Sequence, residues 1–274
     1  MKNTESENIE VNLLLEAIYL KYGYDFRNYS RASIKRRLAH RLSASGLKSI
    51  SEMQHRLLYD TTFFETLLLD FSINVTEMFR DPSFYLALRR DVLPVLKIFP
   101  SLKIWTAGCS SGEEVYSMAI LLQEEALYQR AQIYATDFNE GILSTAKEGI
   151  FPVEYMRKYS ANYLKAGGRK SLSDYYTAKY DSAIMQRSLN KNMVFADHNL
   201  ATDGVFGEMH LILCRNVLIY FDKDLQNRVF KLFRDSLCRG GFLCLGSKES
   251  VRFLKHAENF ENVVKGEVIY RKKT

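Results

Sequence analysis

The sequence lacks any long apolar run. Its most apolar early stretch, residues 12–20, is interrupted by Glu16 and is far shorter than the ~20 residues that a membrane-spanning helix needs. The first ten residues, MKNTESENIE, also lack the basic start and the apolar stretch of a signal peptide. These two absences predict a cytoplasmic protein that does not insert into a membrane.

Cysteine is scarce as well, and its spacing argues against a structural metal site. The cysteines form no CxxC pair and have no histidines at ligand spacing, so a structural zinc site is not expected. We predict no bound metal and four buried, reduced thiols, which are Cys109, Cys214, Cys238 and Cys244.

The composition is that of an ordinary globular protein. Of the 274 residues, 47% are hydrophobic and 26% are charged, which argues against a disordered or fibrous chain. The formal net charge is +6. Such a charge permits an acidic partner, but it does not choose among nucleic acid, anionic lipid and an acidic protein surface.

The first part of the chain has the pattern of a helical bundle. Apolar residues recur at helical spacing over residues 11–69, where proline is absent, and we assign residues 1–74 to an all-α domain. The second helix is expected at about residues 29–42. Basic side chains form adjacent stripes along it, which makes it either an anion-attracting surface or simply a solvated face; they are Arg27, Arg31, Lys35, Arg36, Arg37, His40 and Arg41.

A linker at residues 72–82 precedes an α/β domain, which we place at residues 75–274. Asp81 and Pro82 are typical of a helix start, with an acidic cap and proline at the first position. Short apolar runs then alternate with helical stretches, which indicates a parallel sheet. Residues 155–191 break this alternation and are predicted to be an insertion of small antiparallel strands. The sheet strands are expected at residues 103–107, 132–136, 193–196, 210–214, 241–245 and 267–270.

Residues 102–125, LKIWTAGCSSGEEVYSMAILLQEE, predict a buried strand, a glycine turn and a helix. In a doubly wound sheet such a turn binds a nucleotide at the carboxyl ends of the strands. The turn is neither a P-loop nor GxGxxG. Glu113 and Glu114 would repel a pyrophosphate, but they suit a cationic sulfonium that carries an amino group. The alternative for Glu113 is stabilisation of the first helical turn.

Polar residues also follow the next three strands. Asp137 ends the strand QIYATD, where a carboxylate can accept both ribose hydroxyls of an adenosine; its alternative role is the N-cap of a helix that begins near Asn139. Asn199 and Leu200 follow the third strand, at the place of an adenine contact. The fourth strand, within MHLILCRNVLIYF, is followed by further candidates, which are Arg215, Asn216 and Tyr220, with a satisfied loop arginine and a core tyrosine as the alternatives.

Five motifs resemble the chemoreceptor methyltransferases of the CheR type. They are NVTEMFRDPSF (residues 74–84), AGCSSGEEVYSMAI (107–120), ATDFN (135–139), HNL (198–200) and CRNVLIYFD (214–222). The resemblance implies a class I S-adenosylmethionine-dependent methyltransferase domain of Rossmann-like α/β fold. Many members of that class end their sheet with an antiparallel pair, so we expect the last two strands to be antiparallel. It also implies a small antiparallel β-subdomain inserted in that domain and an all-α domain before it.

The resemblance further implies the cofactor and the residues that contact it. The cofactor is S-adenosylmethionine, with S-adenosylhomocysteine as the product. Tyr220 is implied to face the acceptor, and our candidates for holding the acceptor are Arg80 and Tyr220. The implied cofactor contacts are Asn74, Thr76, Arg80, Ala107, Glu113, Asp137, Asn199, Leu200, Arg215 and Asn216.

The implied substrate is a chemoreceptor, whose cytoplasmic helices carry the glutamates to be methylated. The basic helix of the N-terminal domain is expected to face these acidic helices, and the β-subdomain is a place where a receptor's C-terminal peptide could add as an edge strand. Three alternatives stay open: a nucleic-acid methyltransferase, a cofactor-binding signalling module without turnover, and a nicotinamide oxidoreductase. The first lacks a candidate catalytic cysteine and an Asn-Pro-Pro-Tyr-like motif, and the acidic glycine turn disfavours the last.

Overall fold

The computed structural model describes residues 2–72 and 76–273 of the chain, in two compact units. One unit comprises Met1–Ile73 and Ile219–Val229, and the other comprises Asn74–Leu218 and Phe230–Thr274. The predicted domains, residues 1–74 and 75–274, differ from these units because the prediction leaves residues 219–229 in the second domain.

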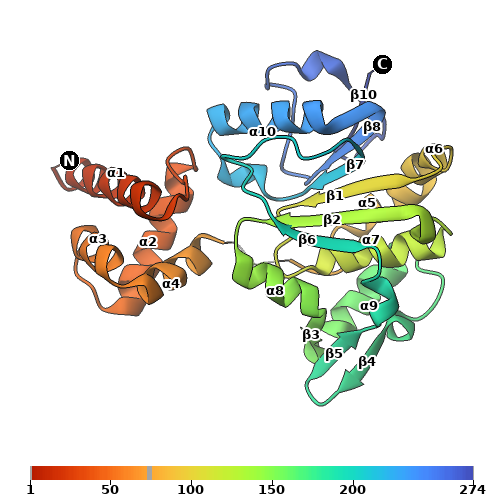
Figure 1. The fold of residues 1–274 in the computed structure, drawn as a ribbon, viewed down its shortest axis with the longest axis horizontal. Helices are drawn as coiled ribbons and strands as arrows, with labels where there is room; N and C mark the ends of the chain where they lie inside the picture. Colours follow the sequence, from red (N-terminus) through yellow and green to blue (C-terminus); the bar gives the residue numbers. More distant parts are fainter. Residues whose placement is uncertain (1, 73–75, 274) are drawn as a thin grey trace. The chain divides into compact units, whose positions relative to one another are not determined.

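The first unit is helical, as predicted. Its helices cap themselves with polar side chains: Ser49 accepts a hydrogen bond from the amide of Glu52, and Asp60 accepts one from the amide of Phe63. Gly46 ends the second helix in the left-handed region at φ +70°, a conformation that glycine adopts readily. The helices are α1 (Lys2–Tyr22), α2 (Arg31–Ser45), α3 (Ile50–Tyr59) and α4 (Thr61–Phe71) (Figure 1).

The segment 219–229 joins this unit through backbone hydrogen bonds. The amide of Ser30 donates to the carbonyl of Tyr220 at 2.8 Å, and the amide of Asp222 donates to the carbonyl of Asn28 at 2.9 Å. The segment includes the first half of α10 (Lys223–Ser236). Tyr220 therefore belongs to the helical unit.

The second unit is built on a seven-stranded sheet in the order β6-β2-β1-β7-β8-β10-β9. β10 is antiparallel to β8 and β9, and the other neighbouring strands are parallel. All six predicted sheet strands are present, and the expected antiparallel ending is confirmed. The strands are β1 (Leu102–Ala107), β2 (Ala131–Asp137), β6 (Met193–Asp197), β7 (Met209–Cys214), β8 (Leu237–Leu245), β9 (Phe260–Asn262) and β10 (Ile269–Lys272).

Helices cover both faces of this sheet (Figure 1). Successive side chains of a strand point to opposite faces. Ile104 of β1 is buried in one cluster with side chains of α7 (Glu113–Glu124), whereas the neighbouring Trp105 contacts Phe233 of α10, with 5.4 Å between ring centroids. The remaining short elements before β1 are α5 (Pro82–Ala87), a π-helical turn η1 (Leu88–Val92) and α6 (Leu93–Leu96), and α8 (Glu140–Glu148) follows β2.

The insertion contains the predicted antiparallel strands, but it begins earlier and also contains a helix. Its sheet has the order β3-β5-β4, formed by β3 (Ile150–Pro152), β5 (Ser182–Met185) and β4 (Tyr176–Lys179). Residues predicted as strands form α9 (Met156–Lys165) instead, because its buried side chains, Met156, Tyr159 and Tyr163, recur at helical spacing.

The predictions about cysteines and membrane spans can be compared with the described residues. All four cysteines are buried and free, as predicted. No helix in the described ranges is both long enough and apolar enough to cross a membrane.

Candidate active site

The glycine turn after β1 joins the ends of the two central strands. The amides of Gly108 and Cys109 both donate to the carbonyl of Thr136, at 2.8 and 2.9 Å. Gly108 has φ +71°, and a Cβ built there would lie 2.7 Å from a methyl of Val217. A side chain does not fit at this position, so the backbone stays exposed to whatever occupies the space above the strand ends.

Asp137 ends β2 with its carboxylate directed to the glycine turn. One oxygen accepts from the amide of Ser110 at 3.0 Å, and the other accepts from the amide of Asn139 at 3.2 Å. Only 8% of the residue is exposed, and this burial raises the pKa of the carboxyl group. The N-cap of α8 is Asn139, which accepts from the amides of Gly141 and Ile142. Asp137 is therefore left as an acceptor at the strand end, and its predicted alternative role as the cap is wrong.

Glu113 begins α7 and is buried in the same region. Its carboxylate accepts from the hydroxyl of Ser111 at 2.7 Å and, more weakly, from the phenol of Tyr159 at 3.4 Å. Burial raises the pKa of Glu113 as well. The N-cap of α7 is Gly112, which has no side chain to cap with.

In an open α/β sheet a ligand binds in the crevice outside the carboxyl ends of the strands, and the two carboxylates make this expected pocket negative. Within the described ranges, neither Glu113 nor Asp137 takes part in an ion pair. Burial raises the pKa of the Cys109 thiol, and the charges of Asp137, Glu113 and Glu114 raise it further. The negative charge of all three carboxylates is therefore felt at the glycine turn, although Glu114 is paired with Arg215. Buried negative charge without a cation is costly, so the arrangement favours a positively charged ligand.

Arg80 lies on a loop between two residues with unusual backbone geometry. Phe79 has φ 52° and Asp81 has φ 55°, and each such residue costs about 1–3 kcal/mol unless the surroundings hold it. The amide of Phe79 donates to the hydroxyl of Ser117 on α7 at 2.9 Å. The predicted helix start at Pro82 is confirmed, but the Asp81 side chain makes no capping hydrogen bond. It forms an ion pair with Arg215 instead.

Helix α9 of the insertion contacts the same loop. Asn162 donates from its amide to the carbonyl of Met78 at 3.1 Å, and Lys158 forms an ion pair with Glu77. Together with the contact from Tyr159 to Glu113, these residues connect the insertion to both walls of the pocket. Sequence reasoning missed them, although the helical spacing of the apolar residues in 156–163 was a usable signal.

Arg215, which follows β7, is almost completely buried, with 3% of its side chain exposed. It donates to the carboxylate of Glu114 at 2.8 Å, to that of Asp81 at 2.7 Å, and to the carbonyl of Arg80 at 3.2 Å. Its guanidinium lies over the ring of Phe84, 4.1 Å from the centroid. Its third nitrogen, Nε, is buried and has no hydrogen-bond partner among the described residues.

Asn216 adopts φ 62° and is held by a carboxylate that sequence reasoning also missed. Its amide donates to Glu249 at 3.0 Å, and Glu249 accepts from the amide of Gly246 through the same oxygen. Only 6% of Glu249 is exposed. The loops after β7 and β8 are thereby held together at the edge of the sheet where the pocket lies.

Asn199 and Leu200 follow β6, whose last residue Asp197 is in register with Asp137. The side chain of Asn199 accepts from the amide of Ala201 at 3.0 Å, and Leu200 is 7% exposed. Both therefore lie at the same edge of the sheet as Asp137, because the two strands are parallel.

The other predicted site residues are placed as follows. Ala107 is the buried last residue of β1, and Thr76 is partly buried on the segment before Arg80. Tyr220 lies in the helical unit, where its ring is 5.3 Å from the guanidinium of Arg37. Asn74 lies outside the described residues. No group of His, Cys, Asp or Glu suited to a metal ion occurs in the part of the chain that the structure describes.

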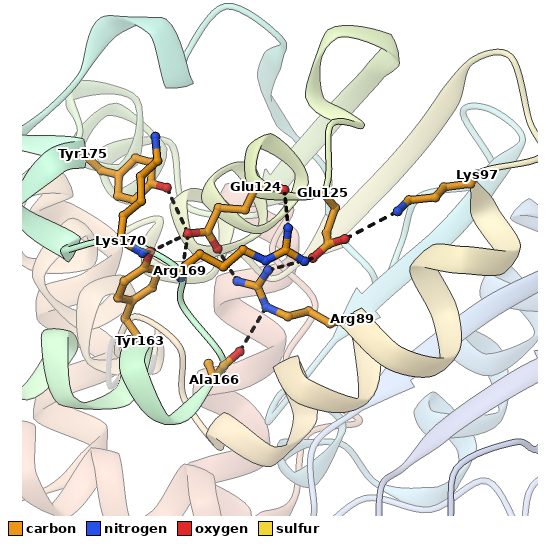
Figure 2. A network of polar contacts seen from close by, with 9 residues as sticks. All are labelled: Arg89, Lys97, Glu124, Glu125, Tyr163, Ala166, Arg169, Lys170 and Tyr175. Carbon is orange, nitrogen blue, oxygen red and sulfur yellow. Dashed lines mark hydrogen bonds and ion pairs between the residues drawn. The ribbon is translucent and has the colours of Figure 1, made fainter.

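The far end of α7 is held by a buried network of charges (Figure 2). Glu125 pairs with Arg89 at 3.0 Å and with Arg169 of the insertion at 2.6 Å. Glu124, with 3% of its side chain exposed, also pairs with Arg89 and accepts from the phenol of Tyr175. The insertion is thus tied to both ends of the helix whose first turn carries Glu113.

Comparisons with known proteins identify the family to which both units are similar. A family model described as "CheR methyltransferase, all-alpha domain" matches residues 9–72, and one described as "CheR methyltransferase, SAM binding domain" matches residues 74–269. A Pseudomonas putida protein named "Putative methyltransferase Cher3" is 56% identical over 272 residues, which are 99% of this chain and 100% of that protein.

Two more distant relatives are similar over most of their length. A "Chemotaxis protein methyltransferase" of Borreliella burgdorferi is 31% identical, over 91% of this chain and 90% of its own. "Chemotaxis protein methyltransferase 2" of Vibrio cholerae is also 31% identical, over 85% of this chain and 82% of its own.

Proposed function

Because the chain belongs to the CheR methyltransferase family, whose members use S-adenosylmethionine, we propose that it methylates glutamate side chains of chemoreceptors. The products would be glutamate methyl esters that serve chemotactic adaptation in the cytoplasm. The observation that carries this proposal is the pair of buried carboxylates, Glu113 and Asp137, beside a glycine turn that admits no side chain.

The residues of the pocket fit the cofactor. Asp137 has a carboxylate at the strand end, where it can accept the ribose hydroxyls, and Glu113 can receive the amino group. Asn199 and Leu200 lie at the neighbouring strand end, where they can contact the adenine. When bound, S-adenosylmethionine supplies a methyl group activated by its positive sulfur.

The acceptor requires alignment more than activation. Glutamate has an ordinary pKa of about 4.3, so its carboxylate is already the nucleophile at neutral pH and needs no general base. The site must instead hold the nucleophile in line with the methyl group, at a separation of roughly 3 Å. We assign this task to Arg80, whose loop is anchored on α7, and to Tyr220.

The direct test is methyl transfer with labelled donor. The purified protein should label glutamates of receptor-containing membranes in a base-labile form, and it should not label RNA or DNA. Labelling of nucleic acid in place of the receptors would favour the rival methyltransferase. Binding of the cofactor without transfer to any of these substrates would favour a signalling module.

We expect the cofactor affinity to fall on acidification at a higher pH than ordinary carboxylates would cause. Burial raises the pKa of both Asp137 and Glu113, and only their ionised forms attract the cation and accept hydrogen bonds at full strength through both oxygens. Affinity is therefore complete above the raised pKa values and is lost as the pH falls through them. Calorimetric titration with S-adenosylhomocysteine between about pH 8 and pH 5 measures this loss. Asp137→Asn should flatten the profile, and a pH-independent affinity in the unchanged protein would contradict the assignment.

The basic helix α2 has fewer cations available to a receptor than its sequence indicates. Three of its cations are engaged within the helical unit: Lys35 with Glu7, Arg41 with Asp70, and Arg37 with backbone carbonyls. Arg27, which precedes the helix, is paired with Asp25. Arg31 and Arg36 are exposed. We propose that these two face the acidic methylation helices of the receptor.

Reversal of both exposed charges, Arg31→Glu with Arg36→Glu, should lower kcat/KM for receptor methylation about tenfold at low salt, because electrostatic steering is lost. The affinity for S-adenosylhomocysteine should not change. The difference from the unchanged protein should shrink as salt is added, since salt screens exposed charges.

The matched control is Arg252→Glu with Lys265→Glu, which changes the net charge equally at two exposed positions of the other unit. It should retain most of the receptor methylation. An equal loss in both double variants would mean that overall charge, rather than the α2 surface, attracts the receptor.

A second receptor contact is proposed at the insertion. β5 lies between β3 and β4, which are the outer strands of that sheet. An outer strand can pair with an added peptide through its backbone groups. A C-terminal receptor peptide is the ligand that we propose for this edge.

A further inference from the structure

The guanidinium of Arg215 connects three segments that are far apart in the sequence. It joins the end of β7 to Glu114 in the first turn of α7 and to the loop that carries Arg80. With 3% of its side chain exposed, Arg215 makes these contacts through its two terminal nitrogens, and its buried Nε has no hydrogen-bond partner in the described ranges. Its flat face is covered by Phe84.

The loop of Arg80 needs such an anchor. Both neighbours of Arg80 have positive φ, a conformation that residues with side chains rarely adopt. One side is held by the hydrogen bond from Phe79 to Ser117. The other side is held by Arg215, which binds both the side chain of Asp81 and the carbonyl of Arg80.

The chemistry of this contact is specific to arginine. Two separate nitrogen atoms donate to Glu114 and to Asp81, while the plane of the group stacks on an aromatic ring. A lysine ammonium has the charge but lacks the planar fork. The contact therefore depends on the planar shape of the guanidinium as well as on its charge.

We propose that Arg215 is a positioning residue, which holds the Arg80 loop in a fixed position relative to α7. Its side chain does not contact the cofactor. This assignment replaces the cofactor contact that the family resemblance implies for Arg215. It rests on the proposed function, because Arg80 is the residue assigned to the acceptor.

The first variant removes the side-chain part of the link to the loop without changing its backbone preference, and it leaves the bond from Arg215 to the carbonyl of Arg80. Asp81→Gly keeps the left-handed conformation available and removes the acceptor, and 42% of the Asp81 side chain is exposed, so the fold should tolerate the change. We expect kcat/KM for the receptor to fall between about tenfold and a hundredfold, since small misplacements of a positioning group have effects of this size. The dissociation constant of S-adenosylhomocysteine should stay within about twofold.

A conservative variant and a control variant distinguish a loss of positioning from a general loss of activity. Asp81→Asn keeps an oxygen that can accept from Arg215 and also tolerates positive φ, so it should recover most of the lost turnover. Asp91→Asn removes a comparable ion pair, the one with Arg90 at 2.7 Å, away from the loop. It should leave turnover unchanged.

The second variant tests Arg215 itself. Arg215→Lys should lower turnover while S-adenosylhomocysteine still binds. A weakened S-adenosylhomocysteine affinity with unchanged turnover at saturating cofactor would overturn the proposal in favour of a direct contact, and so would wild-type turnover in Asp81→Gly. Absence of receptor methylation by the unchanged protein would instead refute the proposed function. If Arg215→Lys fails to fold, the comparison of Asp81→Gly with Asp81→Asn still decides.

Discussion

Replacement of Arg80 by alanine should lower methyl transfer by about a hundredfold or more, because the acceptor carboxylate loses its charged partner and its alignment. The fold should survive, since the loop is held by backbone contacts of its neighbours. The amide of Phe79 donates to Ser117, and the carbonyl of Arg80 accepts from Arg215. Truncating the Arg80 side chain removes neither. Single-turnover transfer with labelled donor measures the effect.

The control for this change is Arg90→Ala, at a side chain that is 74% exposed and pairs with its neighbour Asp91. This variant should turn over like the unchanged protein. Thermal unfolding of both variants shows whether the fold is intact. Wild-type turnover in Arg80→Ala would remove Arg80 from the transfer site.

Replacement of Asp137 by alanine should weaken S-adenosylhomocysteine binding by about a hundredfold or more. Each hydrogen bond to a charged group contributes about 1.5–3 kcal/mol, and the carboxylate is placed to accept two from a ribose. Asp137 also holds the amides of Ser110 and Asn139, so the glycine turn would lose an anchor at the same time. Calorimetry with the product nucleoside gives the affinity directly.

Two further variants separate the ligand contact from the anchor. Asp137→Asn keeps one oxygen acceptor and should show a smaller loss than alanine. Glu140→Ala removes an exposed carboxylate three residues away and should bind the nucleoside normally. Tight binding by Asp137→Ala would show that the ribose is recognised elsewhere.

The strands and the pocket carboxylates could be predicted because their signals are local. A buried strand, a glycine turn and an acidic first helical turn are consecutive in residues 102–114, and Asp137 directly ends the next strand. The parallel arrangement then brings the strand ends to one edge without further information. The basic cluster of α2 could be predicted for the same reason. The contacts that engage several of its side chains could not, because their partners are distant in the sequence.

The contacts that hold the site together could not be predicted in this way. Arg215 and Asp81 are separated by 134 residues, and Arg215 and Glu114 by 101. Nothing in either neighbourhood indicates its partner. Tyr159 and Asn162 belong to a stretch that we predicted as strands, so their contacts with the pocket required the helix that the structure shows.

The sequence alone determined the class of the protein. It indicated a helical first unit, a doubly wound sheet and an acidic glycine turn of the CheR methyltransferase family. Each of these features is encoded locally, in the periodicity of apolar residues or in contiguous motifs. Tertiary structure decided which charges are available and which are occupied. It buries Arg215 among carboxylates, leaves Arg31 and Arg36 exposed, and attaches the insertion to both ends of α7. The reason is physical: burial and ion pairing depend on which distant segments meet, and only the folded chain brings them together.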